Sequence, residues 1–363
     1  AVTVLATSVV SSLKTTPGLD PEARKLLTFV DNRQDASLQA GHVNDFVQVS
    51  HLRGALARAV AKAGAEGLTT ADMPAAVVAE LGMDFADYSA VPDALSTQRR
   101  NVEGTLRDVV AYRLLADLER GWRVTMPNLE QTGKLAIGYV DLDELAAMSS
   151  RWAGTHEVLA GAAPDVRRAV LRDLLNELRR ALAIDAPAFD EARFESLRGK
   201  AQGNLRDPWA MDPDELMVTV RAAFPRSSGG LTGSRADALF LSGRGAFGRY
   251  LRRKATFPGV GTAAGSAALT TADAEQIIVE LLTVAEAAGL VTAVDGGVRG
   301  AGYRVRAEAM LWRAGSGEYG ADDPVRRTVE TEKGSRVNPF FRMLYSQDSV
   351  KLAGLFAREH TAQ

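Results

Sequence analysis

One stretch near the start of the chain constrains its fold more than any other. Residues 26–46 read LLTFVDNRQDASLQAGHVNDF, an apolar run, then five polar or charged residues, then apolar residues at spacings of three and four. The run predicts a buried strand from Leu26 to Val30, and the later spacing predicts a helix that continues to about Val60. A strand, a polar loop and a helix form half of a βαβ unit, which normally belongs to a parallel sheet covered by helices.

The polar loop lies where such folds bind ligands. Ligands gather at the carboxyl ends of parallel strands, and the first turn of the next helix offers free N–H groups to phosphate. Asn32 and Asp35 can cap the helix, Arg33 can reach a phosphate or a carboxylate, and Gln34 can donate and accept hydrogen bonds. Two interpretations stay open: these residues and Asp31 contact a ligand, or they only tie down the turn.

Composition excludes several classes of site. The 363 residues include no cysteine, which excludes disulfides, thiolate zinc sites, iron–sulfur clusters and cysteine nucleophiles, so we expect a cytoplasmic protein. The length predicts two or three domains. A formal charge of -2 gives no overall basic field, so any contact with nucleic acid must come from local patches. No apolar stretch approaches the ~20 residues of a membrane span, so we expect no membrane partner.

The motifs of nucleotide hydrolysis and metal binding are missing from this sequence. It contains no G-x-x-x-x-G-K-[ST] phosphate loop and no D-E-x-[DH] acidic pair to hold Mg²⁺. The four histidines show neither an H-E-x-x-H pattern nor close pairing: His42, His51, His156 and His360. We therefore expect no catalytic residue, no metal and no cofactor in this chain.

The interior of the chain, from about residue 65 to 345, is expected to be mainly helical. The clearest amphipathic helix runs from Arg167 to Leu182, with an apolar face that includes Val170, Leu174 and Leu178. The pattern places four charged residues outside that face: Arg168, Arg172, Glu177 and Arg179.

A repeated pentapeptide marks two helix starts. Leu68–Asp72 recurs as Leu269–Asp273, each with a Thr-x-x-Asp capping signal, although chance in an alanine-rich sequence is a competing explanation. After the second copy come a helix, a strand at Leu290–Val294, a glycine turn and a strand at Gly302–Arg306. This is the order of a winged helix, and the first copy indicates a possible further winged helix near residues 50–85.

The most basic short region is GRGAFGRYLRRK at residues 243–254. Its cations interleave with Phe247 and Tyr250: Arg244, Arg249, Arg252, Arg253 and Lys254. Arginines neutralise phosphates and aromatic rings stack on unpaired bases, so the region is a candidate DNA-backbone patch. The alternative is an amphipathic helix with solvated arginines. On the predicted hairpin three further arginines could follow a phosphate strand: Arg299, Arg304 and Arg306.

Three blocks resemble one family. LLTFVDNRQDASLQAGHVNDF resembles the block that opens the second RecA-like domain of large bacterial superfamily-2 DEAD/DEAH-box helicases, which often end in a zinc-binding DUF1998 or MZB-type module. The relatives in question are mitomycin-repair-type and anti-phage defence helicases. WRVTMPNLEQTGKLAIGYVDLDELA at 122–146 and AREHTAQ at 357–363 also resemble that family. The resemblance implies that this chain is an internal fragment of such an enzyme.

The fold implied by the resemblance is mainly α with a partial α/β part. A split second RecA-like helicase domain would be interrupted by a helical insertion that contains winged-helix domains. Its expected parts are the domain start at 1–64, the helical insertion at 65–235, a winged-helix domain at 236–314 and a return segment at 315–363.

The resemblance also implies a function, namely the nucleic-acid-binding middle region of an ATP-dependent DNA helicase or translocase in repair or phage defence. Six residues would lie near the nucleic acid: Asp31, Asn32, Arg33, Gln34, His360 and Thr361. Expected partners are single-stranded or forked DNA, the remaining helicase domains and proteins of a repair or defence complex. ATP and Mg²⁺ would belong to the parent enzyme, because Walker A, DEAH and arginine-finger motifs are missing here. The alternative is a non-catalytic winged-helix scaffold that binds proteins.

Overall fold

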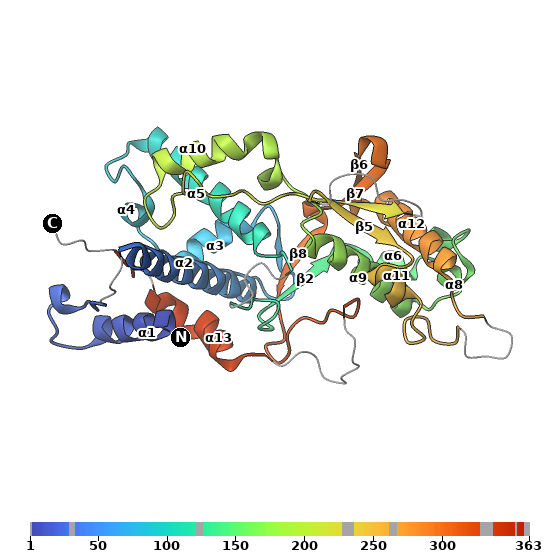
Figure 1. Cartoon of the computed structure of the whole chain (residues 1–363), viewed down its shortest axis with the longest axis horizontal. Helices are drawn as coiled ribbons and strands as arrows, with labels where there is room; N and C mark the ends of the chain where they lie inside the picture. The colour runs from blue at the N-terminus through green and yellow to red at the C-terminus, as the bar shows by residue number, and fades with distance from the viewer. Residues whose placement is uncertain are drawn as a thin grey trace.

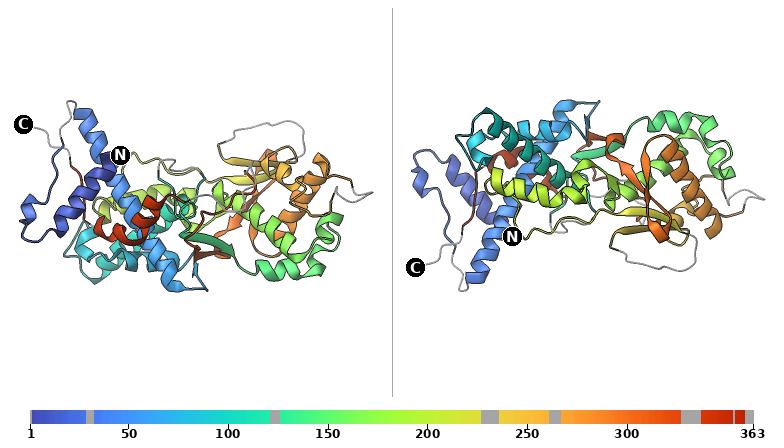
Figure 2. Two further views of the ribbon diagram at one scale, coloured as in Figure 1. Left: turned by 90° about the horizontal axis from the view of Figure 1, so that it is seen from below. Right: turned by 90° about the horizontal axis from the view of Figure 1, so that it is seen from above.

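The computed structural model describes residues 2–28, 33–120, 126–226, 236–260, 267–326, 337–352 and 354–358. These residues are mainly helical and include a small mixed sheet, in agreement with the predicted class of mainly α with a partial α/β part. Figure 1 shows an elongated molecule with a helical part at one end and most strands at the other, and both views of Figure 2 keep this division.

The helical part is built around α2 (Arg33–Ala63), so the long helix predicted after the polar loop is confirmed. Its inner face buries Phe46, Leu52, Leu56 and Val60. Around it lie α1 (Val2–Thr15), η1 (Pro21–Ala23), α3 (Met73–Leu81), α4 (Phe85–Tyr88), α5 (Ser96–Ala116), α10 (Phe194–Asn204), α13 (Pro339–Met343), η6 (Leu344–Asp348) and η7 (Ser349–Leu352).

The strand predicted at Leu26–Val30 is wrong for its described part. Residues 24–28 have no regular structure, while Phe29 and Val30 lie outside the described residues. Leu26 is 41% and Leu27 is 65% exposed. No described strand pairs with this segment, and an unpaired strand leaves its backbone groups unsatisfied by a ladder. An apolar run alone cannot distinguish a buried strand from an exposed segment.

A three-stranded antiparallel sheet lies beside the helical part. Its order is β1 (Leu68–Thr69), β8 (Met310–Ala314) and β2 (Leu135–Tyr139), so the central strand comes last in the sequence. Tyr139 pairs with Met310, and the Val140 N–H donates to the Ala309 carbonyl at 3.0 Å. Residues 140–309 are therefore inserted between two adjacent strands, at one point of the sheet.

Most of this insertion forms the β-containing end of the molecule, which we call the inserted unit. Its sheet has the order β3 (Ile184–Asp185), β7 (Ala301–Arg306), β4 (Ala222–Arg226) and β5 (Ala238–Ser242), with β6 (Val291–Asp295) also paired to β7. The exception is the segment that carries η2 (Pro187–Phe189), η3 (Glu191–Arg193) and α10, because α10 and η2 return to pack on α5. The helices of the inserted unit are α6 (Leu142–Ala147), α7 (Ser149–Trp152), α8 (Glu157–Ala160), α9 (Pro164–Arg180), α11 (Ala246–Leu251) and α12 (Thr271–Ala287).

The local order predicted after the second pentapeptide is present as α12, β6, a glycine turn with η4 (Gly297–Arg299), and β7, followed by η5 (Ala307–Ala309). The Thr270 hydroxyl accepts from the Asp273 N–H at 3.2 Å, and the Thr270 N–H donates to the Asp273 carboxylate at 2.7 Å. This reciprocal pair is the predicted capping box. The first copy differs, because Leu68–Thr69 forms β1 there.

Helix α9 confirms the predicted amphipathic segment but corrects its polar face. Val170, Leu174 and Leu178 are buried as expected. Glu177 and Arg179, predicted to lie outside the apolar face, are also buried, at 3% and 0% exposed. The reason is tertiary, because each meets an oppositely charged partner from another part of the chain, as described below.

The C-terminal residues lie against the first half of α2. Among these described residues η7 forms a single turn, and residues 355–358 are irregular. The Asn44 amide donates to the Ala357 carbonyl at 3.0 Å and accepts from the Ala357 N–H at 2.7 Å. Segments from opposite ends of the sequence are thus hydrogen-bonded neighbours.

None of the described helices combines the length and the apolar character that a membrane crossing requires.

Candidate nucleic-acid interface

The residues that the resemblance places near nucleic acid fall mostly beyond the structural description. Asp31, Asn32, His360 and Thr361 lie outside the described residues. Arg33 is the first residue of α2, and the neighbouring Gln34 is exposed on its first turn. Contact of these six residues with nucleic acid stays a prediction.

The basic region at 243–254 forms α11 and the turn after it. Arg244, Arg249 and Lys254 are exposed, and Arg252 is partly buried. Arg253 instead holds the chain together, because it donates to the carbonyls of Pro324 at 2.5 Å and Val325 at 3.3 Å. The arginines of this region therefore divide into exposed cations and a structural tie.

The aromatic residues of the same region cannot stack on bases. Phe247 is 2% and Tyr250 is 7% exposed. The Tyr250 hydroxyl donates to Asp173 at 2.7 Å, and burial together with that carboxylate raises the pKa of Tyr250. The stacking interpretation of 243–254 is therefore wrong, and the amphipathic-helix alternative describes these two rings.

The arginines predicted on the hairpin are engaged within the inserted unit. Arg299 pairs with Asp237 at 2.9 Å, and its guanidinium lies 5.6 Å from the centre of the Phe224 ring. Arg304 donates to the Arg221 carbonyl at 3.0 Å. Arg306 pairs with Glu308 at 2.7 Å, although its side chain is 44% exposed. Arg299 and Arg304 thus join β7 and its turn to the β4 end of the sheet.

Helix α12 presents acidic rather than basic side chains. It contains no lysine or arginine and four acids: Asp273, Glu275, Glu280 and Glu286. Its first turns are also covered by the segment before α8. The His156 N–H donates to Glu280 at 2.6 Å, and the His156 ring lies 3.7 Å from the Asp273 carboxylate. Since phosphate repels carboxylates, this helix is poorly suited to a nucleic-acid groove.

Helix α5 has the opposite character. One face buries Val102, Leu106 and Val109 in the core, where α5 packs against α3. The residues from Ser96 to Asn101, STQRRN, are all exposed, as is Arg107 one and a half turns further on. Polar donors and arginines therefore extend over the outward side of a helix whose inner side is fixed.

The arginines of α5 lie in a defined arrangement. Arg99 pairs with Glu103 at 3.0 Å and its guanidinium lies 4.6 Å from the centre of the Phe85 ring, yet the side chain is 55% exposed. Arg100 and Arg107 donate to carbonyls of their own helix, those of Ser96 at 3.4 Å and Glu103 at 3.3 Å. Between them lies Gly104, where an added Cβ would meet no atom within 4 Å.

Sequence reasoning missed α5 because it searched for the densest run of cations. The signal that could have found it is a change of pattern: six polar residues, Ser96–Asn101, lead directly into the apolar spacing of Val102, Leu106 and Val109. Such a helix start is polar on all sides before its core face begins. The winged helix expected near residues 50–85 stays a prediction, and its range ends before α5 begins.

A buried ion pair anchors the end of α5 to α2. Arg53 is 1% exposed and donates to both oxygens of Asp117, at 2.8 and 2.6 Å. It also donates to the carbonyls of Met126 and Pro127, each at 3.1 Å, and to the Tyr345 hydroxyl at 2.8 Å. Burial alone would lower the pKa of Arg53, but the Asp117 carboxylate outweighs it and the pKa is raised.

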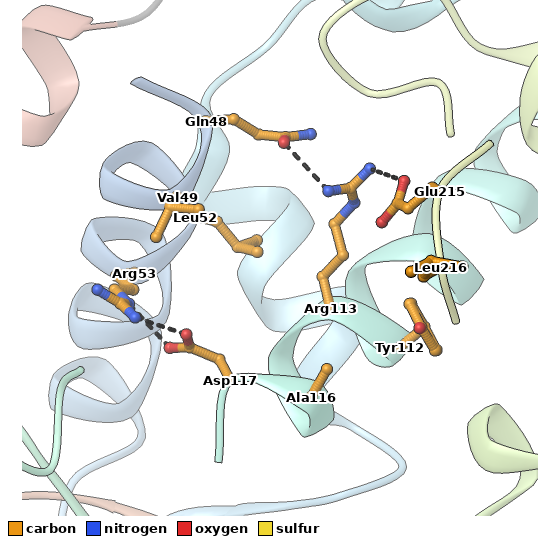
Figure 3. A pocket seen from close by; sticks show the side chains of 10 residues that line it. All are labelled: Gln48, Val49, Leu52, Arg53, Tyr112, Arg113, Ala116, Asp117, Glu215 and Leu216. Carbon is orange, nitrogen blue, oxygen red and sulfur yellow. Dashed lines mark hydrogen bonds and ion pairs between the residues drawn. The ribbon is translucent and has the colours of Figure 1, made fainter. Parts of the chain in front are cut away.

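Figure 3 shows this junction from close by, with Arg113 donating to Gln48 and Glu215 on the side opposite the Arg53–Asp117 pair. The cavity between these side chains measures about 50 Å³. That is room for water rather than for a nucleotide or a drug-sized ligand. The site is a packing junction that fixes α5, not a binding pocket.

A second charged junction fixes the inserted unit. Arg179 of α9 donates to both oxygens of Glu130 at 2.8 and 2.7 Å, and both side chains are buried. Burial would raise the pKa of Glu130, but Arg179 outweighs it and the pKa is lowered. Nearby, Arg120 pairs with Glu177 at 2.8 Å and with Asp323 at 3.0 Å. A cavity of about 490 Å³ lies at this junction, lined by Arg120, Glu130 and Asp323 among other residues. Its charges are thus largely paired within the fold.

A third hollow, of about 720 Å³, lies between α2, the turn after α3 and the C-terminal residues. Arg206 and Arg358 line it together with Asp87 and Asp207, so cations and anions balance. This balance gives it no preference for an anionic ligand. Within the described residues, no group of three or more acidic, histidine or cysteine side chains could hold a metal ion.

Comparisons of this chain with protein-family models, curated proteins and solved structures found no match.

Proposed function

We propose that this chain is the nucleic-acid-binding middle region of an ATP-dependent DNA helicase or translocase, and that α5 meets the nucleic acid. The observation that carries the proposal is the arrangement of α2, β1, α3, α5, β2 and β8, with strand order β1-β8-β2. A helix, a strand, two helices with the short α4 between them, and two paired strands separated by the insertion follow the order of a winged helix, with the first strand paired to the last.

In this proposal α3 and α5 correspond to the two helices of a helix-turn-helix. The second helix of that motif enters the groove and its N-terminal residues contact base edges. Those residues in α5 are exposed and include Gln98, Arg99, Arg100 and Asn101. Arginine and amide side chains are the groups that bind phosphates and the edges of guanine and adenine.

The hydrogen bonds between Asn44 and Ala357 support the wider helicase proposal. The resemblance requires the 26–46 and 357–363 blocks to belong to one split domain, and these bonds join residues of both blocks. In that parent enzyme ATP hydrolysis would drive movement along DNA, and the winged helix formed by α5 would grip the strand or duplex.

A second candidate function applies to the inserted unit. Its α11, α12, β6 and β7 follow the order of a second winged helix, as predicted from the sequence. The acidic α12, with its covered start, favours a module that binds a protein of a repair or defence complex over one that binds DNA.

Binding of the whole chain to labelled duplex, single-stranded and forked DNA tests the proposal. Measured by fluorescence anisotropy, affinity should fall steeply between about 50 and 200 mM salt, because phosphate contacts release counterions. Changing Arg99, Arg100 and Arg107 together to Gln should abolish most of the DNA binding. Absence of binding to all three DNAs at about 50 mM salt would refute a nucleic-acid function.

A further inference from the structure

On the outward face of α5 a glycine lies between two arginines. Arg100, Gly104 and Arg107 are separated by four and three residues, so they share one stripe of the helix. The stripe points away from Val102 and Val109, which are completely buried. Within the described residues its two arginines donate only to carbonyls of their own helix, so their remaining N–H donors can face a ligand.

Gly104 has no packing reason inside the fold. Glycine in a helix interior is less stable than alanine, because its backbone loses more freedom on folding. An added Cβ at position 104 would meet no atom within 4 Å, and Gly104 is helical with ordinary φ. Neither crowding nor backbone conformation requires glycine there. A missing side chain between two arginines does, however, let a backbone from outside approach the helix closely.

The chemistry of this face fits a duplex better than a single strand. Single strands bind to aromatic side chains on which bases stack. From Ser96 to Arg107 the helix contains no aromatic residue, and the nearby Phe85 ring is already covered by Arg99. An α-helix with its side chains is about 10 to 12 Å across, which suits a groove about 12 Å wide.

We infer that α5 binds in the major groove of duplex DNA, with one phosphate backbone seated against the stripe of Arg100, Gly104 and Arg107. This inference rests on the proposed function and specifies its substrate as a duplex. Gln98 and Asn101, exposed beside the stripe, then lie where they can donate to base edges.

Two sets of variants of the whole chain test the inference on a duplex of about 20 base pairs. Arg100→Gln/Arg107→Gln should lower affinity at least about tenfold and reduce the slope of log K against log salt by about 2, one for each lost phosphate contact. The charge-matched control, Arg151→Gln/Arg168→Gln, removes two exposed cations from the inserted unit, where Arg168 makes an exposed pair with Asp143. It should bind as the wild type does.

Position 104 gives a test that does not alter charge. Gly104→Leu should lower duplex affinity about tenfold while the protein stays folded, because the new side chain has open space within the fold but blocks the backbone. Gly104→Ala is the matched control. It should raise the melting temperature and change affinity less than about threefold.

The groove is tested with a duplex whose cytosines carry glucosylated hydroxymethyl groups, which fill the major groove. Binding to this modified duplex should be strongly reduced, whereas binding to the unmodified duplex should be unchanged with a minor-groove ligand present.

If the chain binds DNA but Gly104→Leu and Arg100→Gln/Arg107→Gln bind a duplex normally, the inference is overturned and the proposed function stands. The same holds if only single strands bind. If no DNA binds, the proposed function itself has failed.

Discussion

Helices α5 and α12 hold similar places in the sequence order of their units, yet their surfaces are opposite. Each follows a shorter helix and precedes two antiparallel paired strands, β2 and β8 after α5 and β6 and β7 after α12. Helix α5 exposes Arg99, Arg100 and Arg107, whereas α12 has no cation and its first turns contact His156. The difference teaches that the order of elements identifies a scaffold, while the charge and access of one helix face indicate what that scaffold can bind.

The largest expected effect is on stability, at the junction between the helical part and the inserted unit. Arg179→Met should destabilise the chain by about 3 to 5 kcal/mol, because it leaves Glu130 charged and buried without its main partner. Urea unfolding followed by circular dichroism measures this. Arg168→Met, on the same helix but exposed, is the control. A loss below about 1 kcal/mol for Arg179→Met would mean that the junction does not hold the units together.

Acid should affect the helical part first. Burial, with a smaller contribution from Arg58, lowers the pKa of His51 to about 4, so the folded chain keeps this histidine neutral. Below the ordinary pKa of about 6.5 the unfolded chain binds a proton that the folded chain does not. The His51 contribution should therefore lower stability by about 2 to 3 kcal/mol between about pH 6.5 and 4, and this residue adds no further loss below that range.

The comparison that isolates this effect is His51→Gln, which cannot bind the proton. Its free energy of unfolding should change less with pH than that of the wild type across the same window. Equal losses in both proteins would assign the acid sensitivity to another group. Hydrogen exchange should also show α2 opening before α12, since His51 belongs to the helical part.

A smaller effect is expected on DNA affinity from the cations of the inserted unit. Arg244→Gln/Arg249→Gln/Lys254→Gln removes the three exposed cations around α11, and we expect affinity to fall less than about threefold, through loss of general attraction only. Anisotropy titrations beside the α5 variants measure it. A loss greater than that of Arg100→Gln/Arg107→Gln would reverse the comparison and restore residues 243–254 as the main contact.

The smallest effect is expected at the hairpin. Arg299→Gln breaks the pair with Asp237, whose side chain is 52% exposed, so we expect a loss of at most about 1 kcal/mol in stability and no change in DNA affinity. Thermal unfolding and the same titrations measure both. A clear loss of affinity without a loss of stability would show that Arg299 contacts DNA.

Local patterns predicted the local structure well. The spacing of apolar residues predicted α2 and α9, and the capping signal with its glycine turn predicted α12, β6 and β7. These predictions succeed because helix periodicity, caps and tight turns depend on residues close in sequence. The strand at Leu26–Val30 failed in its described part because a strand also needs a partner, which the run itself does not specify.

The candidate site was harder to predict. The sequence located the cations near 244–254 and 299–306, but it could not show that Arg253 binds the Pro324 carbonyl or that Arg299 pairs with Asp237. It also gave no weight to Arg100 and Arg107, because tertiary packing of α5 against α3 and α10 decides which of its faces is outward.

The sequence by itself determined where the helices, caps and hairpin form, since these follow from interactions within a few residues. Only the tertiary structure decided that β2 pairs with β8 across residues 140–309, and that Glu177 and Arg179 are buried. It likewise decided which arginines are tied and which are exposed. The physical reason is that a charge becomes internal or external according to the partner it meets, and those partners come from distant parts of the chain.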